Sequence, residues 1–126
     1  MAEKKLRFVN KTALKCYLAL PKDVQKQFGL DLHSVQKGET PFSTSKDVSE
    51  SVGDGAIELI WNGSPAYRAI YCVKLDDRVW VLHAFTKTTN GVDQANMKTA
   101  AKRYKDMKTA IEKSKKRATP TAKKKR

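Results

Sequence analysis

Three polar side chains stand out in or just after two runs that are mostly apolar and aromatic, residues 67–74 and 78–85. Arg68 is at the start of the first run, His83 is late in the second, and Lys87 lies just beyond the second run. A charge within a run of Val, Ile, Leu, Trp and Phe must keep water or an anion as its partner, so it lies at a strand end or in a cleft. Cations held on rigid strands can stabilise the charge of a phosphoryl-transfer transition state, and histidine exchanges protons near neutral pH. The pattern indicates a phosphate-handling cleft with Arg68, Lys87 and His83 as its catalytic residues.

The same residues also fit a purely structural interpretation. Arg68 would then cap a strand end, Lys87 would be solvated, and His83 would be a half-buried, hydrogen-bonded residue. Cleavage of RNA needs few protein groups, because the 2′-hydroxyl of the substrate supplies the nucleophile. Residue types alone leave both interpretations open.

The elements that must position these side chains are strands. Residues 67–74 and 78–85 are rich in β-branched and aromatic residues and are joined by a short turn, which predicts a β-hairpin. Residues 56–61 precede it and end at an Asn-Gly-Ser turn, so we expect at least three consecutive antiparallel strands. Residues 6–9 add a short first strand, whereas 40–55 have no periodicity and are expected to form a loop. Because strand side chains alternate, we expect Val81, His83, Phe85 and Lys87 on one face.

Two helices are predicted before the sheet. From residue 12 apolar residues recur at helical spacing until Pro21, which ends one helix and can open the next. The second helix places four apolar residues on one stripe, and Gly38 is its expected stop: Val24, Phe28, Leu32 and Val35. His33, on this helix, is expected at the surface. The expected fold is α+β, with two N-terminal helices packed on a small twisted antiparallel sheet and a C-terminal helix.

The last helix is the most clearly amphipathic segment, and Asp93 is its predicted N-cap. Its apolar side consists of Met97, Ala100, Ala101, Tyr104, Met107 and Ile111. Its other side is basic, with Lys98, Lys102, Arg103, Lys105 and Lys108. Beyond residue 112 the composition cannot bury enough apolar area to order itself, which predicts a frayed helix and then a disordered arm. The expected division is a domain over 1–112 and a flexible basic tail over 113–126.

The charge balance favours a polyanionic partner. The chain has 126 residues and a formal charge of +13, and residues 113–126 alone carry eight Lys and Arg without an acid. Each phosphate neutralised by a basic side chain releases counterions, so RNA or DNA is the expected partner, although an acidic protein or an anionic membrane would satisfy the same electrostatics. We expect six residues to contact RNA backbone: Lys98, Lys102, Arg103, Lys115, Lys116 and Arg117.

Other classes of protein lack support in the sequence. Cys16 and Cys72 stand outside any Cys-x-x-Cys or Cys/His cluster, which predicts two buried, reduced thiols and no metal or other cofactor. The first ten residues have no apolar segment typical of a signal peptide, and no run reaches membrane-spanning length. We therefore expect a cytoplasmic protein with no membrane association.

The central stretch also resembles a known family. Tyr67-Arg68-Ala69-Ile70-Tyr71, followed by Val81-Leu82-His83-Ala84-Phe85-Thr86-Lys87, is similar to the phage-derived HigB-like branch of the RelE/ParE toxin superfamily. The resemblance covers roughly residues 6–112. It implies ribosome-dependent cleavage of mRNA, contact with ribosomal RNA, and neutralisation by a small helix-turn-helix antitoxin. By position, Arg68 matches the arginine at the scissile phosphate, Lys87 the basic residue after the last strand, and His83 the family's histidine.

Two departures from the family pattern leave alternatives open. Ile60 stands where the family often has arginine, and Thr88 where it usually has a second lysine. Each change removes a cation from the expected cleft. The chain could thus be an mRNA endonuclease, a non-catalytic inhibitor of a protein target such as DNA gyrase on the same scaffold, or an RNA-binding module without cleavage activity. The oligomeric state does not follow from the sequence.

Overall fold

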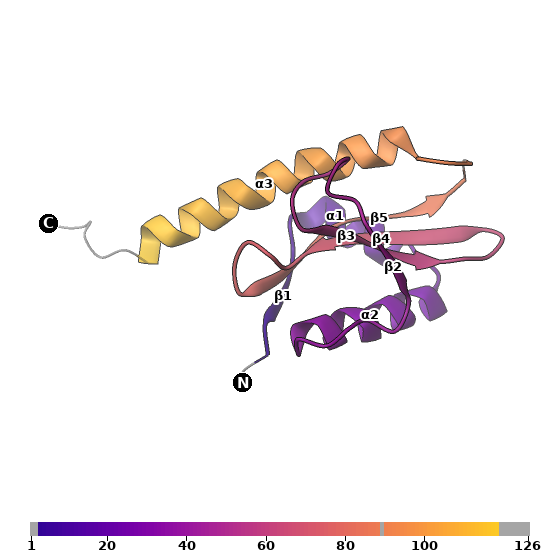
Figure 1. Ribbon diagram of the computed structural model, residues 1–126, viewed down its shortest axis with the longest axis horizontal. Helices are drawn as coiled ribbons and strands as arrows, with labels where there is room; N and C mark the ends of the chain where they lie inside the picture. Colours follow the sequence, from indigo (N-terminus) through magenta and orange to yellow (C-terminus); the bar gives the residue numbers. More distant parts are fainter. Residues whose placement is uncertain (1–2, 89, 119–126) are drawn as a thin grey trace, which may run out of the picture.

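A five-stranded sheet separates two helices that cover its opposite faces, as Figure 1 shows with α3 above the sheet and α2 below it. The computed structural model describes residues 3–88 and 90–118. The elements in chain order are β1 (Lys5–Phe8), α1 (Lys11–Leu18), α2 (Lys22–Gln36), β2 (Thr44–Asp47), β3 (Ala56–Trp61), β4 (Ala66–Cys72), β5 (Arg78–Lys87) and α3 (Gln94–Ala118). This arrangement confirms the predicted fold class.

The sheet has the strand order β1-β5-β4-β3-β2. Strands β3, β4 and β5 form the predicted antiparallel meander, and β1 pairs with β5 in parallel. The expectation of a loop throughout 40–55 is wrong at β2, which pairs antiparallel with β3 at the sheet edge. All four residues of β2 are exposed, so its sequence has no apolar alternation from which a strand could be predicted.

Helix α2 packs the predicted stripe against the lower face of the sheet. Val24, Phe28, Leu32 and Val35 are all buried, together with Leu59, Ala69 and Val81 from the strands. Pro21 stands immediately before α2. At the other end Gly38 has φ +80°, and its N–H donates to the Val35 carbonyl at 2.9 Å. A residue in this left-handed conformation satisfies helix-terminal carbonyls, and glycine adopts it without a steric cost.

One carboxylate is buried on this side, and it fixes the chain that leads into β2. Asp31 on α2 has no exposed surface, and its Oδ1 accepts hydrogen bonds from the backbone N–H groups of Phe42 (2.9 Å) and Ser43 (3.0 Å). Since β2 follows directly, α2 determines where this edge strand begins.

Helix α3 packs on the upper face. Its buried residues Met97, Ala100, Tyr104, Met107 and Ile111 form one cluster with Ile70, Cys72, Trp80 and Leu82 of the sheet. Asp93 is the predicted N-cap, because its Oδ1 accepts the Asn96 N–H at 3.2 Å. The helix continues past the predicted boundary after residue 112 to Ala118. Residues 119–126 of the predicted tail lie outside the described residues.

Helix α1 lies beside β5, and the side chain of its N-cap Asn10 accepts the Ala13 N–H at 2.8 Å. Cys16 on α1 is half-buried and Cys72 on β4 is fully buried, and both are free thiols. Among the helices that the structure describes, none is both long enough and apolar enough to cross a lipid bilayer.

Candidate functional site

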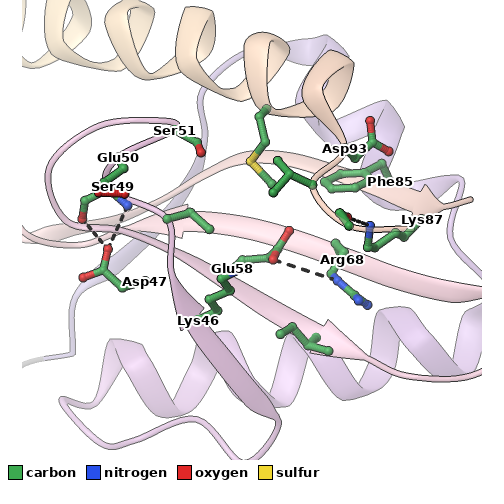
Figure 2. Close-up of a pocket in the computed structure, with 15 residues that line it drawn as sticks. Lys46, Asp47, Ser49, Glu50, Ser51, Glu58, Arg68, Phe85, Lys87 and Asp93 are labelled. Atoms are coloured by element: carbon green, nitrogen blue, oxygen red, sulfur yellow. Dashed lines mark hydrogen bonds and ion pairs between the residues drawn. The ribbon is translucent and has the colours of Figure 1, made fainter. Parts of the chain in front are cut away.

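A groove of about 710 Å³ lies on the α3 face of the sheet (Figure 2). Its floor is formed by β3, β4 and β5, and its sides by β2 with the following turn and by the segment that leads into α3. The lining residues are Lys46, Asp47, Val48, Ser49, Glu50, Ser51, Glu58, Ile60, Arg68, Phe85, Lys87, Gly91, Val92, Asp93 and Met97. Two of the three predicted catalytic residues, Arg68 and Lys87, therefore share one groove.

Arg68 is held rigidly at the floor of the groove. It is 9 % exposed, pairs with Phe85 across β4 and β5, and lies beside Ile60 of β3. Its Nη1 donates to the backbone carbonyls of Tyr67 at 3.0 Å and Trp61 at 3.3 Å. These bonds restrict the guanidinium to one orientation, which is the condition for a cation that stabilises a developing charge.

Lys87 reaches the same groove from the next strand. It pairs with Ala66 across β4 and β5, two residues along from the pair that Arg68 forms with Phe85. Its ammonium donates a hydrogen bond to the backbone carbonyl of Gly91, in the segment before α3. Arg68 and Lys87 thus come from two paired strands, and the register of the hairpin sets the relative positions of their backbones.

Glu58 adds a carboxylate that the sequence analysis did not select. It lies on β3, is 6 % exposed, and its Oε1 is 4.0 Å from Arg68 Nε (Figure 2). Burial raises the pKa of Glu58 above its ordinary value of 4.5, although Arg68, Lys46 and Lys87 oppose the shift. A carboxylate with a raised pKa is a better proton acceptor at neutral pH than an ordinary one, so this group can act as a general base. A single acid in the apolar strand AIELIW was the available signal.

Lys46 supplies a further cation at the edge of the sheet. It lies on β2 directly opposite Glu58 of β3 and lines the groove. Ile60 also lines the groove, and Thr88 is exposed beyond the end of β5. Lys46 thus brings a cation into the groove from a strand that the sequence did not reveal.

His83 does not line the groove. A β-bulge between the Tyr71–Val81 and Ile70–His83 pairs inserts Leu82 as an extra residue in β5. Leu82 and His83 therefore both face α3, while Val81 packs in the cluster between the sheet and α2. The expectation that Val81, His83, Phe85 and Lys87 share a face is wrong for Val81, because the bulge shifts the alternation by one residue. The imidazole stacks on Phe85, which does line the groove, with ring centroids 5.2 Å apart.

The surroundings of His83 keep its imidazole neutral. It is 5 % exposed, and its Nδ1 is 2.9 Å from Arg103 Nη1 while its Nε2 is 2.7 Å from Asn96 Oδ1. Burial is the largest cause that lowers the pKa of His83 below 6.5; Arg103 lowers it further, whereas Asn96 and Asp93 act in the opposite direction. Burial and Arg103 thus favour the uncharged imidazole over the imidazolium.

The placement of Arg103 corrects the sequence analysis. We expected Arg103 on the solvent side of the last helix, but it is 8 % exposed and donates to the Leu82 carbonyl at 3.2 Å as well as to His83. A guanidinium can occupy this buried position because carbonyl and imidazole acceptors satisfy it. It is withdrawn from the predicted RNA-contacting surface.

The remaining predicted RNA contacts lie along α3. Lys98, Lys102 and Lys115 are exposed, and Lys105 and Lys108 lie on the same helix and are also exposed. Lys116 and Arg117 belong to α3, but their side chains lie outside the described part of the structure. Within residues 3–88 and 90–118, no group of three or more His, Cys, Asp or Glu is arranged to hold a metal ion.

Comparison with models of protein families gives a match over most of the chain. The model of the family described as phage-derived protein Gp49-like matches residues 16–105, which include Glu58, Arg68, His83 and Lys87. This family comprises toxins of the toxin–antitoxin type related to RelE. A search of curated proteins finds no match to the chain.

Proposed function

The chain belongs to the phage-derived Gp49-like family, and we propose that it is the toxin of a type II toxin–antitoxin system that inhibits translation by cleaving mRNA on the ribosome. One observation carries the proposal: a buried carboxylate with a raised pKa, a fixed guanidinium and an ammonium line a single groove. These are the groups that metal-independent cleavage of RNA requires.

The reaction begins with the substrate. Glu58 accepts the proton of the 2′-hydroxyl, and the resulting oxygen attacks the adjacent phosphorus. The O2′–P bond forms while the P–O5′ bond breaks, and the leaving 5′-oxygen takes a proton from solvent. Arg68 and Lys87 stabilise the negative charge on the phosphoryl oxygens during this exchange. The products are a 2′,3′-cyclic phosphate on the upstream fragment and a 5′-hydroxyl on the downstream fragment.

The groove and the lysine-bearing face of α3 indicate the proposed partners. The groove would receive the scissile nucleotide of the mRNA, and the exposed lysines Lys98, Lys102 and Lys115 of α3 would contact the phosphates of ribosomal RNA or of flanking mRNA. Membership of a toxin–antitoxin family implies an antitoxin partner. We propose that this partner is a small helix-turn-helix protein and that both act in the cytoplasm.

Replacement of Arg68 by alanine tests the proposal. Primer extension on mRNA in a translating extract is expected to show cleavage by the wild type and about 10²- to 10³-fold less by Arg68→Ala, the usual loss when one group that stabilises the transition state is removed. Arg78→Ala is the matched control, because Arg78 is a β5 arginine that pairs with Asp76 outside the groove. Circular dichroism verifies that both variants are folded.

Three results would contradict the proposal in different ways. Wild-type cleavage by Arg68→Ala would remove the groove from the mechanism. RNA binding with a steep salt dependence but without cleavage by the wild type would favour the RNA-binding module. Inhibition of DNA gyrase supercoiling without added RNA would favour the inhibitor of a protein target.

A further inference from the structure

Four polar side chains form a continuous chain from the interior of the molecule to the groove. Arg103 Nη1 is 2.9 Å from His83 Nδ1, His83 Nε2 is 2.7 Å from Asn96 Oδ1, and Asn96 Nδ2 is 2.9 Å from Asp93 Oδ2. Arg103 and His83 are buried at the interface of α3 and β5, whereas Asp93 lines the groove. The catalytic steps proposed above use none of these four residues.

The two end groups of this hydrogen-bonded row of side chains, a guanidinium and a carboxylate, fix the direction of every hydrogen bond in the row. A guanidinium can only donate, and an ionised carboxylate can only accept. His83 Nδ1 must therefore accept from Arg103, so the hydrogen of the neutral imidazole resides on Nε2 and is donated to the Asn96 carbonyl oxygen. The Asn96 amide then donates to Asp93. Each link is satisfied only if His83 is the neutral Nε2–H tautomer.

This direction is incompatible with proton transfer by His83. Protonation would place a second N–H on Nδ1, pointing at the N–H of Arg103, and would set two like charges together in a buried site. Deprotonation of Nε2 would remove the hydrogen bond to Asn96. The imidazole also does not line the groove, although Phe85, on which it stacks, does.

Asp93, the member of the hydrogen-bonded row that lines the groove, belongs to the segment that Lys87 contacts. Asp93 accepts the backbone N–H of Asn96 at 3.2 Å, and its own carbonyl accepts the Met97 N–H at 2.9 Å. Two residues earlier, the Gly91 carbonyl accepts the hydrogen bond from the Lys87 ammonium. The polar chain therefore fixes one end of residues 91–93, and Lys87 contacts the other end.

We propose that His83 and Arg103 are positioning residues, which hold segment 91–93 and through it the Lys87 ammonium in the groove, and that His83 transfers no proton in the reaction. The catalytic part of this inference rests on the proposed function. It assigns His83 a different part from the acid–base role that its residue type suggests.

A conservative substitution separates the two roles. Glutamine retains a donor and an acceptor but cannot exchange protons near neutral pH. We expect His83→Gln to keep the cleavage rate within about threefold and the wild-type pH profile, and His83→Leu, which has neither group, to lose at least about tenfold. A fall of about 10²-fold or more in folded His83→Gln, the loss typical of a missing general acid or base, would overturn the inference.

A second measurement does not depend on cleavage activity. The chain has two histidines, so ¹⁵N NMR of the His33→Gln variant reports on His83 alone; His33 is exposed on α2 near Glu3. We expect an unprotonated Nδ1 and a protonated Nε2 at pH 7, and the loss of this single-tautomer spectrum in Arg103→Met. A charged imidazolium at pH 7, or the Nδ1–H tautomer, would overturn the inference. If wild-type protein cleaves no mRNA, the proposed function fails, and this spectrum still decides whether the hydrogen-bonded chain exists.

Discussion

The molecule presents cations in two contrasting regions. In the groove, Arg68 is 9 % exposed and donates to two backbone carbonyls, and Lys87 donates to a third. Along the outer face of α3, Lys98, Lys102, Lys105 and Lys108 are exposed to solvent. The first set is fixed by strands and hydrogen bonds, and the second is carried on flexible side chains of four methylenes.

The contrast separates chemistry from affinity. A charge stabilises a transition state effectively only if its position is set before the reaction, because repositioning the group would otherwise cost the free energy that its charge contributes. Exposed lysines meet phosphates in many geometries and contribute a salt-dependent attraction without selecting one linkage. We therefore expect substitutions in the groove to change the rate of cleavage and substitutions on the face of α3 to change binding.

The largest effect is expected for Glu58→Gln. The amide cannot accept the 2′-hydroxyl proton, so the cleavage rate should fall about 10²- to 10⁴-fold. Only the ionised carboxylate is a base. The wild-type rate should therefore increase as the pH rises through the raised pKa of Glu58, and it should be lost at pH values below that pKa. The residual rate of the variant should lack this dependence. Single-turnover cleavage at several pH values measures both.

Glu50→Gln is the matched control for this substitution, because Glu50 lines the same groove but is exposed. Its cleavage rate should remain near that of the wild type. Equal losses in Glu50→Gln and Glu58→Gln would show that the groove responds to its net charge and not to a positioned base.

The smallest effect is expected for the double substitution Lys98→Ala and Lys102→Ala. Removal of two exposed charges should weaken RNA binding at low salt and reduce the slope of log K against log salt by roughly 0.7 for each single-strand phosphate that is no longer neutralised. The single-turnover rate at saturating RNA should not change. Lys22→Ala, on α2 at the opposite face of the sheet, is the control in the binding titration. A large decrease in the rate at saturation would abolish the distinction between the two regions.

The sequence predicted those parts of the fold that apolar periodicity determines. The stripe of Val24, Phe28 and Leu32 is correct because it buries one face of α2, and the strand 56–61 is correct because its mostly apolar run is buried or half-buried on both faces of the sheet. β2 was not predicted because an exposed edge strand has no such face; it is recognised only through its pairing with β3. Lys46, which β2 carries into the groove, was missed for the same reason.

The site was predictable in its cations but not in its geometry. Arg68 and Lys87 were conspicuous because charges interrupt an apolar hairpin. The bulge at Leu82 depends on how β4 and β5 align, and no local signal indicates it, so the face of Val81 was predicted wrongly. Arg103 was assigned to solvent because its basic neighbours on α3 are exposed, yet the helix turns it toward β5 and the His83 acceptor.

The chemistry of the product ends tests the central claim most directly. Fragments of mRNA produced by the wild-type protein in a translating extract can be labelled by polynucleotide kinase with and without prior phosphatase treatment. Attack by the 2′-hydroxyl predicts a downstream fragment with a 5′-hydroxyl, which is labelled without phosphatase, and an upstream fragment that ends in a cyclic phosphate. A 5′-phosphate on the downstream fragment, or intact mRNA, would contradict the proposal that Glu58, Arg68 and Lys87 promote attack by the RNA 2′-hydroxyl on the adjacent phosphate.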